Sequence, residues 1–206
     1  MERIADQIRR PAVVLATASG RWVEPTTHHC AICVGIHTVV NGVDLAPRQR
    51  TSAYVEDNRN KIVDYALEIE KTDRRLDGIM WYDTDMVFPH DTLLRLYAHN
   101  KPIVGANYRA REHPYPYLGM FSDGEDPRYD PKVPLRPMNW LPGGLLYVGM
   151  TVYRKMPPPW YEINPGRDRD DIAFCRKAKE LGYEVWCDMK LTAEVRHIGA
   201  VEVPWG

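Results

Sequence analysis

The sequence predicts an α/β fold in which a mostly parallel central sheet is flanked by helices. Short apolar segments alternate with segments that carry apolar residues at helical spacing through the first half of the chain. Such alternation is typical of strand–helix–strand units, whose strands pair in parallel. The length of 206 residues suits one domain, so residues 1–206 are expected to form a single unit.

Composition and charge argue against several classes of protein. The chain is 44% hydrophobic and 27% charged, which is ordinary for a globular protein. Its net charge of −1 argues against a protein that coats nucleic acid. No apolar run approaches the ~20 residues that span a bilayer, and the segment from Met1 to Arg10 lacks the apolar core of a signal peptide. We therefore expect a cytoplasmic protein without a membrane span.

The first half of the chain supplies three apolar runs, which we expect to be strands, and the helices between them. The run at residues 12–16 ends in small and hydroxyl residues, and a helix at 25–40 ends at Asn41-Gly42. A short strand is expected at 43–46 and a polar loop at 48–51. Ser52 would cap a helix reaching residue 71, which has apolar residues at helical period. The next strand is expected at 78–82.

The second half is less regular. Pro89 and Asp91 would begin a helix, and a strand is expected at 101–106. Residues 107–139 are rich in proline and tyrosine without a steady period, which predicts a long irregular insertion. Residues 140–155 are interpreted as a Gly-Gly turn and a strand. A helix at 168–181, ended by Gly182, would precede a last strand at 183–188.

Two carboxylates follow the apolar run at residues 78–82. Extended geometry would point Asp83 and Asp85 the same way and Thr84 opposite. Two like charges ~4 Å apart repel by about 4 kcal/mol at an effective dielectric near 20. The pair therefore favours a hard divalent cation, which would in turn hold a phosphate. The simpler alternative is that one Asp caps the next helix and the other is solvated.

Three further residues are candidates to meet a nucleotide. Thr17 and Ser19 follow the first strand, where ligands bind in open α/β sheets, although ordinary turn chemistry explains them equally well. Arg59 lies in the first turns of its helix, where the helix dipole disfavours a cation. A bound anion would explain Arg59, and so would a solvated surface position.

Four segments occur in a recognisable order: NRNKIVDYAL with Arg59-Asn60; WYDTDMVFPHDTLLRL; LPGGLLYVGMTVYRKMPPPW; and DDIAFCRKAKELGYEVWCD followed by His197. This order resembles that of nucleotide-sugar-dependent glycosyltransferases of the GT-A fold, in particular small family 2-like members of bacterial and phage type. The resemblance covers most of the chain from about residue 50 onward, and 107–139 has no clear counterpart. It implies a single GT-A, Rossmann-like domain with the insertion on the acceptor side, in a host cytoplasm if the protein is phage-encoded.

The resemblance also implies an activity and the residues that perform it. A sugar would pass from a nucleotide-diphosphate sugar, in the first place a UDP-sugar, to an acceptor hydroxyl with inversion. Asp85 would bind a divalent metal, Mn or Mg, and Asp83 would bind the ribose, the metal or both. His197 would complete the metal ligands as a neutral imidazole. Arg59 would face the nucleotide or its diphosphate.

Further residues are implied for proton removal and for the two sugars. Asp171 matches the position of the general base and Asp170 stands where glutamate is usual, so which of the two is the base stays open. Helix capping is the alternative for Asp170. The other assignments are a close backbone approach to the donor sugar at Gly143 and Gly144, an aromatic acceptor platform at Trp160 with core packing as its alternative, and acceptor contacts at Tyr108 and Arg109.

Two other functions fit parts of the same pattern. A nucleotidyltransferase also uses a nucleotide and a metal, but the loop ATASGRWVEP has one basic residue and lacks the Gly-rich basic pattern of that class. A non-catalytic nucleotide- or sugar-binding module is the second alternative. The acceptor stays open among a saccharide, a protein, a small molecule and a hydroxylated base of viral DNA. The basic residues that could line a nucleic-acid groove are Arg48, Arg50, Arg109 and Arg111.

Overall fold

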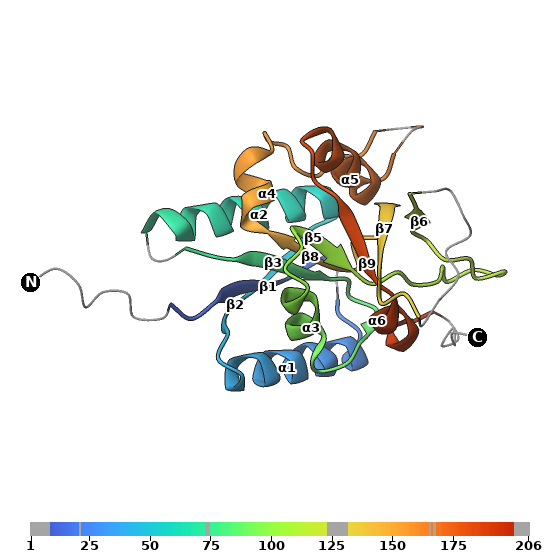
Figure 1. The fold of residues 1–206 in the computed structure, drawn as a ribbon, viewed down its shortest axis with the longest axis horizontal. Helices are drawn as coiled ribbons and strands as arrows, with labels where there is room; N and C mark the ends of the chain where they lie inside the picture. The colour runs from blue at the N-terminus through green and yellow to red at the C-terminus, as the bar shows by residue number, and fades with distance from the viewer. Residues whose placement is uncertain are drawn as a thin grey trace, which may run out of the picture.

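The structure is built on a sheet of eight strands in the order β2-β1-β3-β8-β5-β9-β7-β6 (Figure 1). This computed structural model describes residues 9–20, 22–72, 75–122, 132–164, 166 and 168–199. The strands are β1 Ala12–Ser19, β2 Asp44–Thr51, β3 Gly78–Tyr82, β5 Ile103–Gly105, β6 Met120–Phe121, β7 Leu135–Trp140, β8 Leu145–Gly149 and β9 Val185–Asp188.

Most strands of this sheet point in one direction. β1 is parallel to β2 and β3, and β5 is parallel to β9. β8 is antiparallel to both β3 and β5, and β7 is antiparallel to β9 and β6. Among the described strands, β8 and β7 are therefore the two that run in reverse. The predicted α/β class with a mostly parallel sheet is confirmed, and the amino end of β8 lies beside the carboxyl end of β3.

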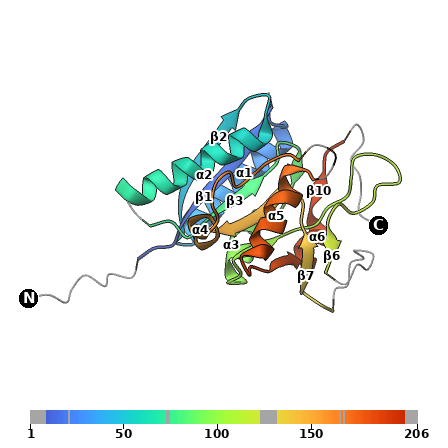
Figure 2. The same cartoon turned by 90° about the horizontal axis from the view of Figure 1, so that it is seen from above.

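Helices cover both faces of the sheet (Figures 1 and 2). One face carries α2 Val55–Thr72, α4 Met150–Lys155 and α5 Asp170–Glu180, and the other carries α1 Pro25–Val40, α3 Thr92–Ala98 and α6 Met189–Glu194. Along β1, Val14 and Ala16 pack toward the first face while Val13 and Leu15 pack toward the second. Burial on both faces explains why β1 is a continuous apolar run instead of an alternating one.

A second, two-stranded sheet lies beside the first. Its strands β4 Met86–Val87 and β10 Arg196–His197 pair antiparallel, with His197 opposite Met86. This pairing brings a segment near the end of the chain next to the turn that follows β3. No helix within the described ranges is long and apolar enough to cross a membrane.

Several predicted boundaries are wrong, because tertiary pairing determines them. β2 continues to Thr51, so residues 48–51 are part of a strand and not a loop; their alternate side chains face solvent, which made them look like a polar loop. Residues 150–155 form α4 instead of continuing the preceding strand. α2 begins at Val55 and α3 at Thr92, each later than predicted.

The predicted irregular insertion at 107–139 is only partly irregular. Its last residues belong to β7, where Leu135 pairs with Asp188 and Met138 with Val185. β7 contains Pro137 and has the burial pattern of a partly exposed strand, so its local sequence gave no strand signal. Residues 123–131 of the insertion lie outside the described part of the chain.

Replacement by alanine is expected to change the stability in opposite directions at two glycines, Gly105 in β5 and Gly35 in α1. A Cβ added at Gly105 would collide with the Leu145 carbonyl oxygen of β8, whereas one at Gly35 in α1 would meet only Leu45 Cδ1 at 3.9 Å. We expect Gly105→Ala to destabilise the protein by about 1–3 kcal/mol. Gly35→Ala should stabilise it by about 0.5–1 kcal/mol, because alanine favours a helix interior. Urea unfolding of both variants measures this, and equal shifts of one sign would contradict the packing shown.

Candidate functional site

A cleft of about 580 Å³ opens at the carboxyl ends of β1 and β3. Ligands of open α/β sheets bind at this kind of edge. Segments that are far apart in the sequence contribute to the cleft, because α5 and the β4–β10 ladder lie close to the turn after β3. Among the predicted site residues, those that line it are Arg59, Asp83, Asp85, Tyr108, Asp170, Asp171 and His197.

Arg59 lies at the bottom of the cleft and is only 4% exposed. Its Nη2 donates to Asp83 Oδ1 at 3.0 Å, and its Nη1 is 3.5 Å from Asp170 Oδ2. The guanidinium also lies over Tyr161 at 5.4 Å and Trp81 at 5.8 Å from the ring centroids. Burial alone would lower the pKa of Arg59, but the nearby carboxylates outweigh burial and raise the pKa above its ordinary value. The side chain therefore stays charged, and the surface alternative is wrong.

The carboxylates around Arg59 outnumber it. Burial raises the pKa of Asp83 above its ordinary value; Arg59 opposes this rise, whereas Asp85 adds to it. Burial also raises the pKa of Asp171, again against the influence of Arg59. One guanidinium thus faces several crowded carboxylates, and this part of the cleft attracts further positive charge.

Gly143 and Gly144 connect these groups through their backbone. The N–H of Gly143 donates to Asp171 Oδ2 at 3.2 Å, and that of Gly144 donates to the Tyr108 hydroxyl at 3.0 Å. A Cβ at Gly143 would collide with the Arg59 guanidinium, and one at Gly144 would collide with the Tyr108 hydroxyl. Glycine is therefore needed here for packing against the protein itself, and a contact with the donor sugar stays a prediction.

Asp171 lies in the first turn of α5, at the positive end of the helix dipole. Its Oδ1 accepts the Ile172 N–H at 2.9 Å, and its Oδ2 accepts the Gly143 N–H. The residue before the helix is Arg169, and no side-chain cap bond is found there within the described residues. Asp170 is the first helical residue and is directed toward Arg59, so the capping alternative for Asp170 is wrong.

Asp85 and His197 face each other across the turn after β3. Both are buried, and His197 Nε2 is 3.4 Å from Asp85 Oδ1. His197 Nδ1 is 3.0 Å from the Arg109 carbonyl oxygen, which can only accept a hydrogen bond. The N–H of His197 is therefore on Nδ1, and its Nε2 presents a lone pair.

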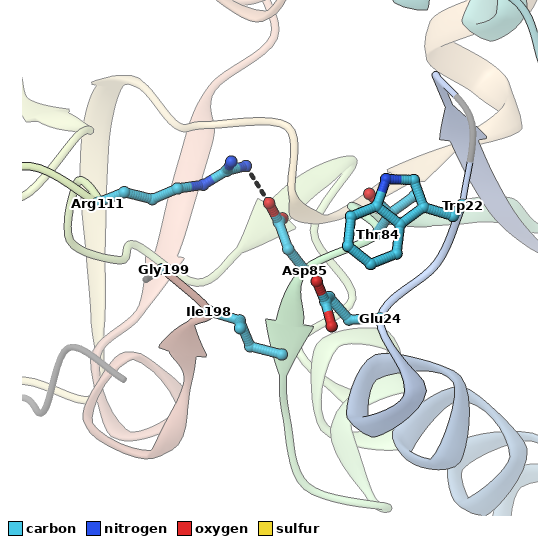
Figure 3. A pocket seen from close by; sticks show the side chains of 7 residues that line it. All are labelled: Trp22, Glu24, Thr84, Asp85, Arg111, Ile198 and Gly199. Carbon is cyan, nitrogen blue, oxygen red and sulfur yellow. Dashed lines mark hydrogen bonds and ion pairs between the residues drawn. The ribbon is translucent and has the colours of Figure 1, made fainter. Parts of the chain in front are cut away.

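Arg111 reaches into this pair from the insertion. Its Nε donates to His197 Nε2 at 3.0 Å. Its Nη2 pairs with Asp85 Oδ2, and Figure 3 shows this ion pair. Arg111 is expected from the sequence only in a nucleic-acid groove, so its place in this site is not predicted. A basic side chain two residues after Arg109 was the available signal.

Asp85 and His197 fit a divalent cation as two protein ligands. Asp85 Oδ1 is buried without a hydrogen-bond partner among the described residues, and His197 Nε2 points the same way. A carboxylate oxygen and a neutral imidazole nitrogen suit Mn or Mg with further oxygen ligands. Asp83 is directed to Arg59 instead, and no three such side chains converge within the described ranges. Participation of Asp83 stays a prediction.

Several predicted site residues, among them Trp160, Thr17 and Ser19, do not line the cleft. Trp160 is 5% exposed, and its indole N–H donates to the carbonyls of Tyr153 and Met156 at 3.1 and 3.0 Å, so the acceptor-platform prediction is wrong and core packing is correct. Thr17 and Ser19 are buried, and Ser19 Oγ is 2.8 Å from Thr51 Oγ1.

The strand β1 explains why Thr17 and Ser19 miss the cleft. It continues to Ser19, so alternate side chains point into opposite layers, and Ala18 with Gly20 line the cleft instead. In the insertion, Tyr108 lines the cleft, whereas the Arg109 guanidinium lies 4.9 Å from the Tyr117 ring centroid. The predicted acceptor contact of Arg109 therefore has no support from its position.

Comparison with known proteins supports the fold of this chain and does not assign it to a family. No protein-family model matches the chain, and no curated protein matches it. Solved structures do match, and A197 from STIV aligns with a TM-score of 0.59 over 91% of this chain and 85% of that chain, at 15% identity. At this identity the likeness supports the shared α/β fold alone.

The buried position of Arg59 predicts a large loss of stability on its removal. Arg59→Met leaves Asp83, Asp170 and Asp171 without their common cation, so we expect a cost of about 3–5 kcal/mol near pH 7. The folded-state pKa values of Asp83 and Asp171, which burial already raises, then rise further above those of the unfolded chain. The folded variant then binds protons more tightly than its unfolded chain. The loss in free energy of unfolding relative to wild type therefore shrinks as the pH falls to about 5.

The matched control is Lys61→Met, which lies two positions after Arg59 in the same helix, α2. Lys61 pairs with Asp57, and the two side chains are 48% and 45% exposed. Loss of such an exposed pair costs about 0–1 kcal/mol. Urea unfolding at both pH values compares the two variants, and equal costs for them would show that Arg59 does not neutralise the cleft.

Proposed function

We propose that the protein is a cation-dependent glycosyltransferase, which moves a sugar from a nucleotide-diphosphate sugar to an acceptor hydroxyl with inversion. The observation that carries the proposal is the meeting, in one cleft, of a pair of side chains suited to a cation and a separate carboxylate. Asp85 and His197 form the first, and Asp171 is the second. A diphosphate leaving group needs positive charge, and a hydroxyl nucleophile needs a base.

The nucleotide fits the part of the cleft that lies between β1 and α2. Tyr54 and Val55 line this part at the amino end of α2, whose dipole favours anions. The Tyr54 side chain is exposed and offers a ring face to a base. A UDP-sugar is the first donor to test. A divalent cation at Asp85 and His197 would supply the positive charge that the departing diphosphate oxygens require.

Asp171 is the general base in this proposal. The acceptor oxygen attacks the anomeric carbon, and its proton passes to the Asp171 carboxylate. The anomeric C–O bond breaks, and its electron pair leaves on the diphosphate oxygen. Each Asp171 oxygen accepts one backbone N–H, so lone pairs remain for the proton. Burial raises the pKa of Asp171 above its ordinary value, which strengthens it as a base.

Asp170 serves Arg59 and is not the base. Its Oδ2 is 3.5 Å from Arg59 Nη1, so this carboxylate compensates the buried guanidinium. The insertion and the acceptor side supply Tyr108 and Leu118 to the same cleft. The acceptor is defined no further than a group that presents a hydroxyl.

The proposal predicts a separation of binding and transfer in Asp171→Asn. The amide keeps the shape of the carboxylate but cannot take the proton, so we expect transfer to fall by about 10²–10⁴-fold. Calorimetry with UDP and Mn²⁺ should give an affinity close to that of wild type. Asp168→Asn is the control, because Asp168 pairs with Arg176 and does not line the cleft. Retained transfer in Asp171→Asn rejects this base, and absence of Mn²⁺-dependent UDP binding in wild type rejects the donor.

The pH dependence of transfer follows from the raised pKa of Asp171. The base acts only when deprotonated, so the rate at saturating donor falls as the pH drops through the folded-state pKa. The midpoint of this fall should lie above about 3.9, the ordinary value for aspartate. UDP and Mn²⁺ binding, measured at each pH, separates this loss from loss of the donor. A rate that is constant down to pH 4 while binding persists would contradict the assignment.

A further inference from the structure

Arg111 lines two neighbouring pockets. The cleft of about 580 Å³ and a second pocket of about 400 Å³ share Thr84, Asp85 and Arg111 as lining residues. Trp22 and Glu24 line the second pocket on the far side of Asp85 (Figure 3). The Arg111 side chain thus lies at the boundary between the cleft and the second pocket.

The contacts of Arg111 are those that a bound cation would need. A neutral imidazole has one ring lone pair, and in His197 this is on Nε2, because Nδ1 carries the proton that is donated to the Arg109 carbonyl. Arg111 Nε donates to that lone pair at 3.0 Å. His197 can therefore bind a metal only after Arg111 Nε has left. Arg111 also neutralises Asp85, the second ligand of the same site.

Arg111 is placed so that it can leave. Its side chain is 54% exposed, whereas that of Asp85 is 13% exposed. An ion pair with one half-exposed partner is weak and easily exchanged. Asp85 and His197 are fixed by comparison, because the β4–β10 ladder and the Arg109 carbonyl hold them. The movable member of this cluster is the arginine.

We propose that Arg111 is a built-in occupant of the cation site, and that a divalent cation must displace it in order to bind. The displaced guanidinium remains at the edge of the cleft, where it pairs with the anionic ligand that the cation holds. Cation and diphosphate then bind cooperatively, because each stabilises the state in which Arg111 has moved. The cooperativity with a diphosphate rests on the proposed function; the displacement itself rests on the geometry alone.

Mn²⁺ binding followed by electron paramagnetic resonance, with and without UDP, tests the displacement. We expect Arg111→Ala to bind Mn²⁺ alone about tenfold more tightly than wild type, and to gain less affinity from UDP. Asp85→Asn should abolish Mn²⁺ binding in both backgrounds. Arg95→Ala, which removes an arginine paired with Glu194 away from the cleft, should leave the Mn²⁺ affinity unchanged.

A second measurement uses the wild-type protein and does not depend on any variant. Arginine Nε–H resonances followed during a titration with diamagnetic Mg²⁺ should show a large shift for Arg111 and none for buried Arg59. An unchanged Arg111 resonance at saturating Mg²⁺ overturns the inference. So does wild-type Mn²⁺ affinity in Arg111→Ala, or an equal gain of affinity in Arg95→Ala.

These outcomes are separable from those of the proposed function. Displacement of Arg111 in a protein that transfers no sugar supports the inference and rejects only the transferase. Cation-dependent sugar transfer with an unmoved Arg111 supports the transferase and rejects only the inference.

Discussion

The buried guanidinium of Arg59 is the interaction on which the cleft depends. It lies between Asp83 after β3 and Asp170 at the start of α5, so it joins two segments that would otherwise repel each other. Beneath it, the Trp81 indole N–H donates to the Tyr153 hydroxyl, which is 2.7 Å from the Tyr161 hydroxyl. These buried polar groups satisfy one another, which gives the charged layer a rigid support.

Arg59 and Arg111, two of the arginines that line the cleft, have different surroundings. Arg59 is enclosed by aromatic rings and carboxylates, and its removal would leave buried charge without compensation. Arg111 pairs with Asp85 from a half-exposed position. The carboxylates of the cleft thus face one buried guanidinium and one half-exposed guanidinium. Under the proposed displacement, the half-exposed arginine would yield to a ligand while the buried arginine stays in place.

Sequence reasoning worked where local pattern determines structure. The helix at Pro25–Val40 has the predicted bounds, and the turn after Gly78–Tyr82 places Asp83 and Asp85 at the sheet edge as the apolar run indicated. Sequence patterns did not predict the positions of side chains that depend on contacts with residues far away in the sequence. Trp160 was predicted as an acceptor platform with core packing as the alternative, and the carbonyls of Tyr153 and Met156 hold it in the core. The site role of Arg111 depends on His197, 86 positions away, and no local pattern reports it.

The β4–β10 ladder has a consequence for the order in which the molecule assembles. The hydrogen bond between His197 and the Arg109 carbonyl spans 88 positions, so it closes a long loop at an entropic cost that local contacts avoid. The sheet and its helices have many contacts of their own and do not need this bond. The corner that carries Asp85 and His197 rests on a ladder of two residue pairs, so it should form after the eight-stranded sheet and open before it in the native state.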